Sequence, residues 1–316
     1  MNWREHRGLG KTGLRVTGIC VGGSPIGNMP NVYGYGVEDE QAVALVRAVL
    51  SGTFNFLDTS NGYGNGTSER RIGAAIKAHG GLPEGFVLDT KVDADPETRD
   101  FSGDRVRRSV EESFERLGIA YCPLMYFHDP EYYMTFEEAM LPGGPVEALV
   151  KLKEEGVVGN IGVAAGPIPM MLEYVKTDLF QVVLSHNRYT LVDRSAVPLM
   201  EEAIKRNVAY VNAAPYGGGI LAKGLGDNAR YMYREAKPQT VEAVRSIQAA
   251  CARHQIPLAA AALQFSLRDP RVSSTVVGMS DASRIDETVA LADHPIPAEF
   301  WTELETMVPP NEVWVG

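Results

Sequence analysis

The stretch TFNFLDTSNGYGNGTSERRIGAAI, residues 53–76, holds one complete strand, loop and helix. It begins as a short apolar run that ends in a carboxylate, Asp58. A glycine-rich segment then carries a tyrosine, Tyr63, before helical sequence resumes. In barrel enzymes a strand delivers ionisable side chains to one end of the sheet, where the following loop lies. Taken singly, Asp58 could equally cap a turn and Tyr63 could cover a loop.

The same alternation continues along the chain. Short runs rich in Val, Ile, Phe or Tyr are separated by longer segments whose apolar residues recur at three and four positions, and this predicts strands alternating with amphipathic helices. Helices are expected, for example, over 38–52, 103–118 and 196–208. Residues that tolerate a left-handed backbone follow three helices, at Gly118, Gly156 and Asn207. The eight predicted strands are 16–22, 53–58, 86–91, 121–128, 157–163, 180–185, 208–213 and 272–278.

Eight such pairs predict a closed (β/α)8 TIM barrel. The glycine-rich VGGSPIG, 21–27, leads into a loop instead of opening a helix, which disfavours a doubly wound dinucleotide-binding sheet. Residues 1–15 predict a short N-terminal hairpin over the barrel bottom. The segment from Pro215 to Thr240 is a long loop after the seventh strand and a candidate lid. Because no linker rich in Pro, Gly or Ser interrupts the pattern, we expect residues 1–316 to form a single domain.

Composition narrows the function classes. The chain has 45% hydrophobic and 22% charged residues, as expected for a globular protein with a sizeable core. Its 40 acids exceed its 30 basic residues, which argues against nucleic acid or a membrane as partner. Without a signal peptide or a long apolar run, the expected location is cytoplasmic. The scattered cysteines, Cys20, Cys122 and Cys251, predict core packing, with neither disulfides nor a metal site.

Four ionisable residues are expected at one end of the barrel. Asp58, Lys91 and His128 end the second, third and fourth strands, and Tyr63 lies in the loop after the second. A phenol titrates near 10, and a neighbouring ammonium such as Lys91 lowers that value. Asp58 would keep Lys91 charged and oriented, while His128 would donate a hydrogen bond to a substrate oxygen.

This tetrad suits the interconversion of a carbonyl and an alcohol, in which oxygen exchanges a proton while carbon exchanges a hydride. Because the chain itself holds no hydride source, the chemistry implies a nicotinamide cofactor. Two alternatives stay open at this point. Lys91 could form a Schiff base in a lyase, or the barrel could be a regulatory subunit that binds a nucleotide without turnover.

The chain resembles the aldo-keto reductase family over nearly its whole length. The resemblance rests on GKTGLRV at 10–16, FLDTSNGYGNGTSERRIGAAI at 56–76, TK at 90–91 and FHDP at 127–130. It implies that Tyr63 is the general acid or base, that Asp58 and Lys91 tune it, and that His128 orients the substrate oxygen. NRYTLVD at 187–193 and APYGGGILA at 214–222 resemble a branch named for L-fucose, L-galactose and D-threo-aldose 1-dehydrogenases.

The resemblance also implies where the cofactor, NADP or NAD, is bound. Where the family has a Ser-Asn pair for the nicotinamide amide this chain has Ala164 and Ala165, and the family's stacking aromatic falls near Ala213. Arg284 stands where the family has an arginine for the 2′-phosphate, but the usual preceding lysine is Gly278, so NADP stays possible and NAD competes. The implied cofactor residues are Gly23, Ser24, Asp58, His186, Pro215, Tyr216, Gly217, Gly219, Leu221, Gly278, Ser280, Arg284, Glu287 and Thr288.

The sequence therefore predicts an NAD(P)-dependent oxidoreductase acting on a sugar or sugar-like aldehyde or alcohol. Aldose 1-dehydrogenase activity is favoured, and NADPH-dependent reduction of a polyhydroxylated aldehyde is the alternative. Arg230, Tyr231 and Tyr233, in the long loop, could line the substrate pocket, although a solvated loop is an equal reading. The oligomeric state is left open.

Overall fold

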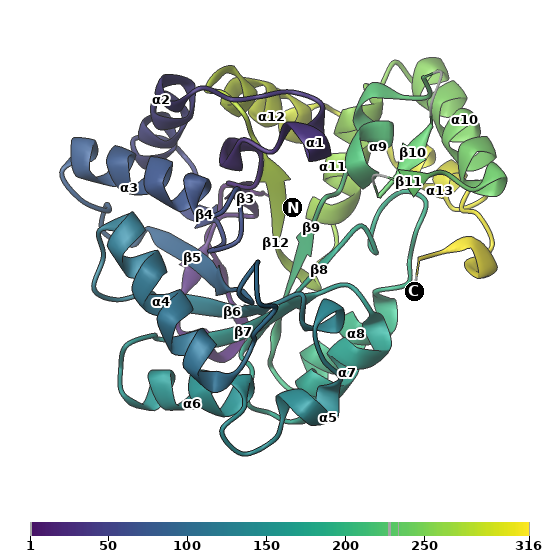
Figure 1. Ribbon diagram of the computed structural model, residues 1–316. Coiled ribbons are helices and arrows are strands. Elements are labelled where there is room, and N and C mark those ends of the chain that lie inside the picture. Colours follow the sequence, from purple (N-terminus) through teal and green to yellow (C-terminus); the bar gives the residue numbers. More distant parts are fainter. Residues whose placement is uncertain (1, 227–228, 233, 316) are drawn as a thin grey trace.

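A closed barrel of eight parallel strands forms the centre of the computed structural model, which describes residues 2–226, 229–232 and 234–315. Around the barrel the strands follow chain order, and the last strand pairs with the first (Figure 1). The predicted (β/α)8 barrel is confirmed. Its strands are β3 (Ile19–Gly22), β4 (Phe56–Asp58), β5 (Val87–Val92), β6 (Leu124–His128), β7 (Ile161–Ala165), β8 (Val182–His186), β9 (Ala209–Ala213) and β12 (Val272–Gly278).

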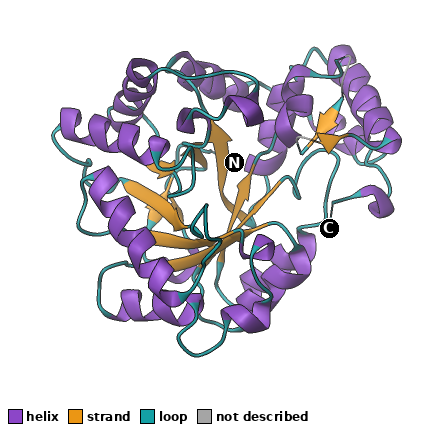
Figure 2. Ribbon diagram, in the orientation of Figure 1, coloured by secondary structure: helices purple, strands orange, loops and turns teal. Residues whose placement is uncertain are grey.

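Helices surround the strands (Figure 2). In α4 (Gly103–Leu117), which was expected over 103–118, the side chain of Ser102 accepts a hydrogen bond from the Arg105 amide. Gly118, with φ 69°, ends this helix. Short 3-10 turns lie at Gly10–Thr12, Pro25–Gly27, Pro130–Tyr132, Gly217–Gly219 and Asn311–Val313. The α-helices are α1 (Pro30–Tyr33), α2 (Asp39–Leu50), α3 (Thr67–His79), α4 (Gly103–Leu117), α5 (Phe136–Ala139), α6 (Pro145–Glu154), α7 (Ile168–Lys176), α8 (Val197–Lys205), α9 (Ile220–Lys223), α10 (Pro238–Arg253), α11 (Leu258–Leu267), α12 (Ser283–Asp293) and α13 (Ala298–Leu304).

The N-terminal hairpin closes the bottom of the barrel, as predicted. Strands β1 (Arg7–Gly8) and β2 (Arg15–Val16) pair antiparallel, and Leu9 between them is fully buried among residues of the barrel interior. Gly10 has φ +56°, and a Cβ there would lie 2.6 Å from the backbone nitrogen of Ala209, where β9 begins. Only glycine allows the hairpin to approach this closely.

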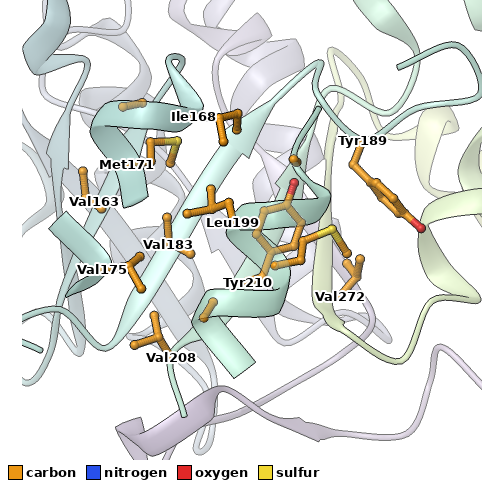
Figure 3. Packing of buried hydrophobic residues seen from close by; sticks show 14 of the residues in the cluster. Val163, Ile168, Met171, Val175, Val183, Tyr189, Leu199, Val208, Tyr210 and Val272 are labelled. Atoms are coloured by element: carbon orange, nitrogen blue, oxygen red, sulfur yellow. The ribbon is translucent and has the colours of Figure 1, made fainter. Parts of the chain in front are cut away.

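The main core fills the space between the barrel and its helices. Figure 3 shows Val163 of β7 and Val183 of β8 near Met171 and Val175 of α7 and Leu199 of α8. All these side chains are buried, and each adds about 1.5–3 kcal/mol by leaving water. The three cysteines are free and buried, as expected. No helix in the described ranges is long and apolar enough to cross a membrane.

The long connection after β9 folds back on the barrel. It contains α9 and a small antiparallel hairpin of β10 (Arg230–Tyr231) and β11 (Arg234–Glu235). The Tyr231 hydroxyl donates to the backbone oxygen of Asn187 at 2.5 Å. Its ring leaves no room for a side chain at Gly217, where a Cβ would lie 2.5 Å from a ring carbon. Tyr231 is therefore a packing residue, and Tyr233 lies outside the described residues.

Candidate active site

A cavity of about 640 Å³ opens at the C-terminal end of the barrel strands. Its wall includes the predicted tetrad, Asp58, Tyr63, Lys91 and His128. The four side chains meet because β4, β5 and β6 are neighbours in the barrel and each presents a polar residue near its carboxyl end. This end of a barrel is where enzymes of this fold assemble their catalytic groups.

Lys91 and Asp58 form a buried ion pair. The ammonium donates to Asp58 Oδ1 at 2.5 Å and to the backbone oxygen of Thr59 at 2.6 Å. The two side chains are 1% and 4% exposed, so the pair is largely shielded from solvent. Burial alone would lower the pKa of Lys91, but its interactions with the acidic groups around it, Asp58 above all, outweigh burial and hold that pKa above its ordinary value. Lys91 is therefore an ammonium at any physiological pH.

Tyr63 lies over this ammonium. Lys91 Nζ is 4.7 Å from the centroid of the phenol ring. Burial raises the pKa of Tyr63 well above its ordinary value, and Lys91 offsets only part of that rise. Lys91 thus lowers the pKa of Tyr63 as expected, but the net shift is upward because the cost of burying a phenolate exceeds the ammonium's effect. The resting tyrosine is a neutral phenol.

His128 stands edge-on to Tyr63, with the ring centroids 5.7 Å apart. Its Nδ1 lies 2.7 Å from Asp93 Oδ1. Burial alone would lower the pKa of His128, but the charges of Asp93 and Asp129 raise it by more than burial lowers it, so the net shift is upward. Sequence reasoning missed Asp93. Its only signal was a carboxylate two residues beyond Lys91, in the acid-rich segment VDADP.

Asp89 is a second acid that sequence reasoning missed. It has no exposed surface, and no donor in the described chain bonds to either carboxylate oxygen. Burial and the charge of Asp58 raise the pKa of Asp89 well above its ordinary value. Asp89 and Lys91 are two apart on β5 and so share a face of the strand, which is a signal that the sequence did contain.

The cavity also includes several of the implied cofactor residues. Besides the tetrad, its wall contains Ser24, His186, Pro215, Tyr216, Gly219, Gly278 and Arg284. The Ser24 hydroxyl is hydrogen-bonded to that of Tyr33 at 2.7 Å. The apolar residues Ala164 and Ala213 lie in the same wall, at positions where the sequence departs from the family pattern.

The other implied cofactor residues are described but are not part of the cavity wall. Leu221 and Thr288 are buried, and Gly23 packs so that a Cβ would lie 2.8 Å from the backbone oxygen of Asp58. Gly217 is covered by Tyr231. Ser280 uses its backbone oxygen to accept from Gln41. Glu287 accepts a hydrogen bond from Arg284 at 2.6 Å. A role for these residues in cofactor binding stays a prediction.

Two residues of the cavity wall each have a buried polar atom without a described partner. Asn187 Nδ2 lies 3.1 Å from His186 Nδ1, whereas its buried Oδ1 bonds to no group among residues 2–226, 229–232 and 234–315. The Tyr216 hydroxyl is likewise buried without a described partner. Burial lowers the pKa of His186 to about 4, so this imidazole is neutral. Asn187 lines the cavity and was not expected as a site residue.

Comparisons of the chain with a family model, with related sequences and with a solved structure all point to the same family. Residues 18–308 match the model of the aldo/keto reductase family. The chain is 32% identical to an L-galactose dehydrogenase from Arabidopsis thaliana over 98% of its length and 97% of that protein. It is 30% identical to a D-threo-aldose 1-dehydrogenase from a Pseudomonas species over 92% and 94% of the two chains. An aldo-keto reductase from Bacillus halodurans, solved in its holo form, superposes with a TM-score of 0.80 at 21% identity over 98% of both chains.

The barrel fold, with the tetrad in the wall of the cavity at the strand ends, is that of an oxidoreductase of the nicotinamide-dependent barrel class. The chain belongs to the aldo/keto reductase family. It is accordingly an NAD(P)-dependent oxidoreductase.

Proposed function

We propose that this protein oxidises an aldose or a closely related cyclic sugar at its anomeric carbon, with NAD or NADP as hydride acceptor, to give a lactone. The observation that carries the proposal is the arrangement of Tyr63 between the Lys91 ammonium and the His128 ring on the cavity wall. Relatives named L-galactose dehydrogenase and D-threo-aldose 1-dehydrogenase support the substrate class. We treat residues 1–316 as one catalytic domain.

The cavity fits a nicotinamide dinucleotide. Asn187 Oδ1, a buried acceptor without a described partner, suits the amide N–H groups of a carboxamide, and the Tyr216 hydroxyl offers a further polar contact. Arg284, in the same wall, supplies the positive charge that a phosphate requires. The bound cofactor would accept the hydride from the sugar during oxidation. The proposed cofactor contacts are therefore Asn187, Tyr216 and Arg284, with the backbone around Gly219.

In the oxidative direction Tyr63 acts as the base. It takes the proton of the anomeric hydroxyl while the C–H bond gives up its hydride, so the hydroxyl carbon becomes the carbonyl of the lactone. Lys91 stabilises the phenolate that must form first, and Asp58 holds Lys91 in place through the 2.5 Å contact. His128 fixes the oxygen that changes charge.

The part of the cavity wall beyond the tetrad suits a polyhydroxylated substrate. Asp129 and His186 both line the cavity, and Asp129 Oδ2 is 3.7 Å from His128 Nε2. A carboxylate accepts hydrogen bonds from adjacent sugar hydroxyls, whereas a neutral imidazole both donates and accepts. The same carboxylate disfavours anionic substrates by charge repulsion.

Reduction of a polyhydroxylated aldehyde is the second candidate, and one observation favours it. Because burial raises the pKa of Tyr63, the resting side chain is the phenol that reduction needs as a proton donor. The Schiff-base alternative is disfavoured, since a nucleophilic lysine must lose its proton and the pKa of Lys91 is raised. Retention of the complete tetrad disfavours a regulatory subunit without turnover.

A spectrophotometric screen tests the proposal. Aldoses are offered with NAD and with NADP, and polyhydroxylated aldehydes with the reduced cofactors, while absorbance of the reduced nicotinamide is followed. We expect oxidation of at least one aldose with formation of its lactone. Activity confined to aldehyde reduction would support the second candidate, and cofactor binding without turnover of any sugar would refute both.

A further inference from the structure

Asp93 joins two parts of the proposed active site. Its Oδ1 is 2.7 Å from His128 Nδ1. Its Oδ2 accepts from the Gly62 amide at 2.7 Å and from the Ser60 hydroxyl. Gly62 immediately precedes Tyr63, so one carboxylate holds both the imidazole of His128 and the loop that carries the phenol.

The contact at Gly62 depends on the absence of a side chain. A Cβ at this position would lie 2.9 Å from Asp93 Cγ and about as close to both carboxylate oxygens. A larger residue would push the carboxylate away from the amide. The close approach of the Asp93 carboxylate thus requires a glycine between Asn61 and Tyr63.

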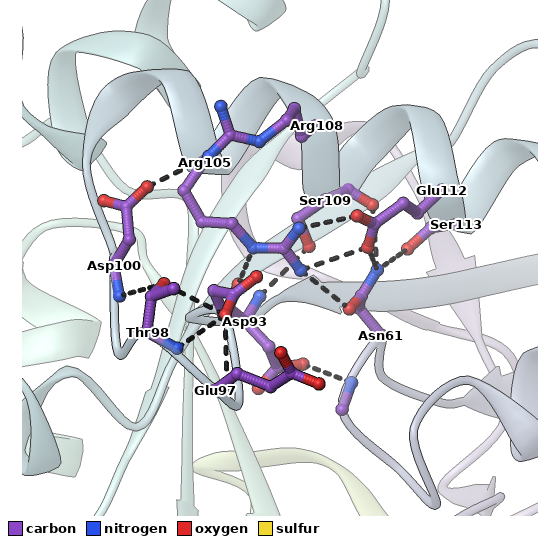
Figure 4. A network of polar contacts seen from close by, with 12 residues as sticks. Asn61, Asp93, Glu97, Thr98, Asp100, Arg105, Arg108, Ser109, Glu112 and Ser113 are labelled. Carbon is purple, nitrogen blue, oxygen red and sulfur yellow. Dashed lines mark hydrogen bonds and ion pairs between the residues drawn. The ribbon is translucent and has the colours of Figure 1, made fainter.

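Helix α4 fixes the position of Asp93 from behind (Figure 4). The Asp93 amide donates to Ser109 Oγ at 3.1 Å, and its backbone oxygen accepts from Arg105 Nε at 3.1 Å. The same helix binds Asn61, whose amide donates to Glu112 at 3.0 Å. Strand β5 and the Tyr63 loop are therefore held against one rigid element, which limits movement of the carboxylate.

This geometry decides which nitrogen of His128 carries a proton. A carboxylate can only accept, so Nδ1 must be the donor in the 2.7 Å contact. With Nδ1 protonated, a neutral His128 has only a lone pair at Nε2. His128 can donate from Nε2 to a substrate oxygen only as an imidazolium.

We propose that Asp93 is a positioning residue whose carboxylate accepts a hydrogen bond from the protonated Nδ1 of His128, so that His128 meets the substrate oxygen as a cationic Nε2–H donor. The proposal rests on the proposed function and deepens it. A cationic donor stabilises the negative charge that develops on a carbonyl oxygen during reduction. In oxidation it favours the alkoxide that forms as Tyr63 removes the hydroxyl proton.

The other charges around His128 act in both directions. Asp129, the residue that follows β6, has its carboxylate 3.7 Å from Nε2 and favours the cation, as Asp93 does. Lys91, on β5, opposes it. Tyr63 contributes a neutral phenol, and His186, on β8, is uncharged because its pKa is about 4. Asp93 is the nearest of the carboxylates and the one directly bonded, so its removal should have the largest effect.

Nitrogen-15 NMR of the imidazole side chains tests the proposal without any turnover. In the wild-type protein we expect His128 to titrate above the ordinary value of about 6.5 and to lose its proton from Nε2, keeping Nδ1 protonated. A neutral form with its proton on Nε2 would overturn the proposal. A failed sugar screen would leave this readout intact, so the two proposals fail separately.

The variant arm uses Asp93→Asn with Asp95→Asn as matched control. Asp95 undergoes the same chemical change two residues away, where its carboxylate accepts from Glu97 and Thr98 and from no other residue that the structure describes. We expect Asp93→Asn to lower the His128 titration by about one unit or more and Asp95→Asn to leave it unchanged. In the reductive direction the decline of kcat/KM with rising pH should then begin at a lower pH in Asp93→Asn than in the wild-type protein. At a pH within this decline, kcat/KM of the variant should be about tenfold below that of the wild-type protein. An unchanged His128 titration in Asp93→Asn would refute the proposal.

Discussion

Asp58 and Asp89 lie directly opposite each other in the parallel pairing of β4 with β5, and their residues are 3% and 0% exposed. Lys91 donates to Asp58 and not to Asp89. Two buried carboxylates beside a single ammonium would leave one net negative charge in the barrel interior. Because that state is costly, Asp89 keeps its proton and faces Asp58 as a neutral acid.

Replacing Asp89 by Asn should stabilise the fold in a pH-dependent way. The pKa of Asp89 is raised on folding, so its stabilising contribution is complete below the unfolded value near 3.9 and is lost as pH rises toward the folded value. Asn removes that loss. We expect the free energy of unfolding of the variant to exceed that of the wild-type protein by about 1–3 kcal/mol at pH 8 and to be nearly equal to it at pH 4. Urea unfolding at the two pH values measures this, and a variant less stable at pH 8 would show that Asp89 is ionised and bound.

Tyr63→Phe should remove turnover and keep cofactor binding. The substitution deletes the hydroxyl that exchanges the proton and leaves the ring over Lys91 in place. We expect kcat to fall by about 10²–10⁴-fold, with the Kd for cofactor, measured by fluorescence titration, within a factor of two or so. Tyr121→Phe is the control, since that tyrosine is 51% exposed and is not part of the cavity wall. Near-normal turnover in Tyr63→Phe would remove Tyr63 from the mechanism.

The carboxyl ends of the barrel strands could be read from the sequence more accurately than their beginnings. The strand expected over 53–58 starts only at Phe56, and that over 121–128 starts at Leu124, yet both end as predicted. Phe54 and Cys122 precede these strands and are buried in the core shared by the barrel and its helices, but neither belongs to a regular ladder. A run of apolar residues shows that a segment is buried, but it does not show where the segment begins to pair as a strand. The polar residues Asp58 and His128 do mark where strand pairing ends.

Asp93 and Asn187 could not be found in this way. Both lie in loops just beyond a strand, where acids and amides are common for reasons of turn formation. What sets them apart is a partner from another unit: His128 from β6 for Asp93, and Tyr231 from the long loop for the backbone of Asn187. Such contacts follow from closure of the barrel and docking of that loop, which a linear pattern does not contain.

Oxidation should accelerate as pH rises. Burial raises the pKa of Tyr63, so at neutral pH only a small fraction is the phenolate that takes the hydroxyl proton. That fraction grows about tenfold per pH unit below the pKa. We expect kcat for aldose oxidation to increase steeply between about pH 7 and pH 9 and kcat for aldehyde reduction not to increase. Steady-state rates in both directions across this range are the measurement, and a flat oxidative profile would mean that hydroxyl deprotonation does not limit the rate.

Arg284 and Glu287 should control the choice between NADP and NAD. Their 2.6 Å contact joins side chains that are 33% and 51% exposed, so it is a weak surface pair that a phosphate can displace. A 2′-phosphate would gain Arg284 and be repelled by Glu287. We expect Arg284→Ala to weaken NADP binding with little change for NAD, and Glu287→Gln to strengthen NADP binding by about fivefold. Calorimetric Kd values of each variant for NADP and for NAD measure this change in cofactor preference. Equal losses for NADP and NAD in Arg284→Ala would show that Arg284 does not contact the 2′-phosphate, because a residue that reads this group must leave NAD, which lacks it, almost unaffected.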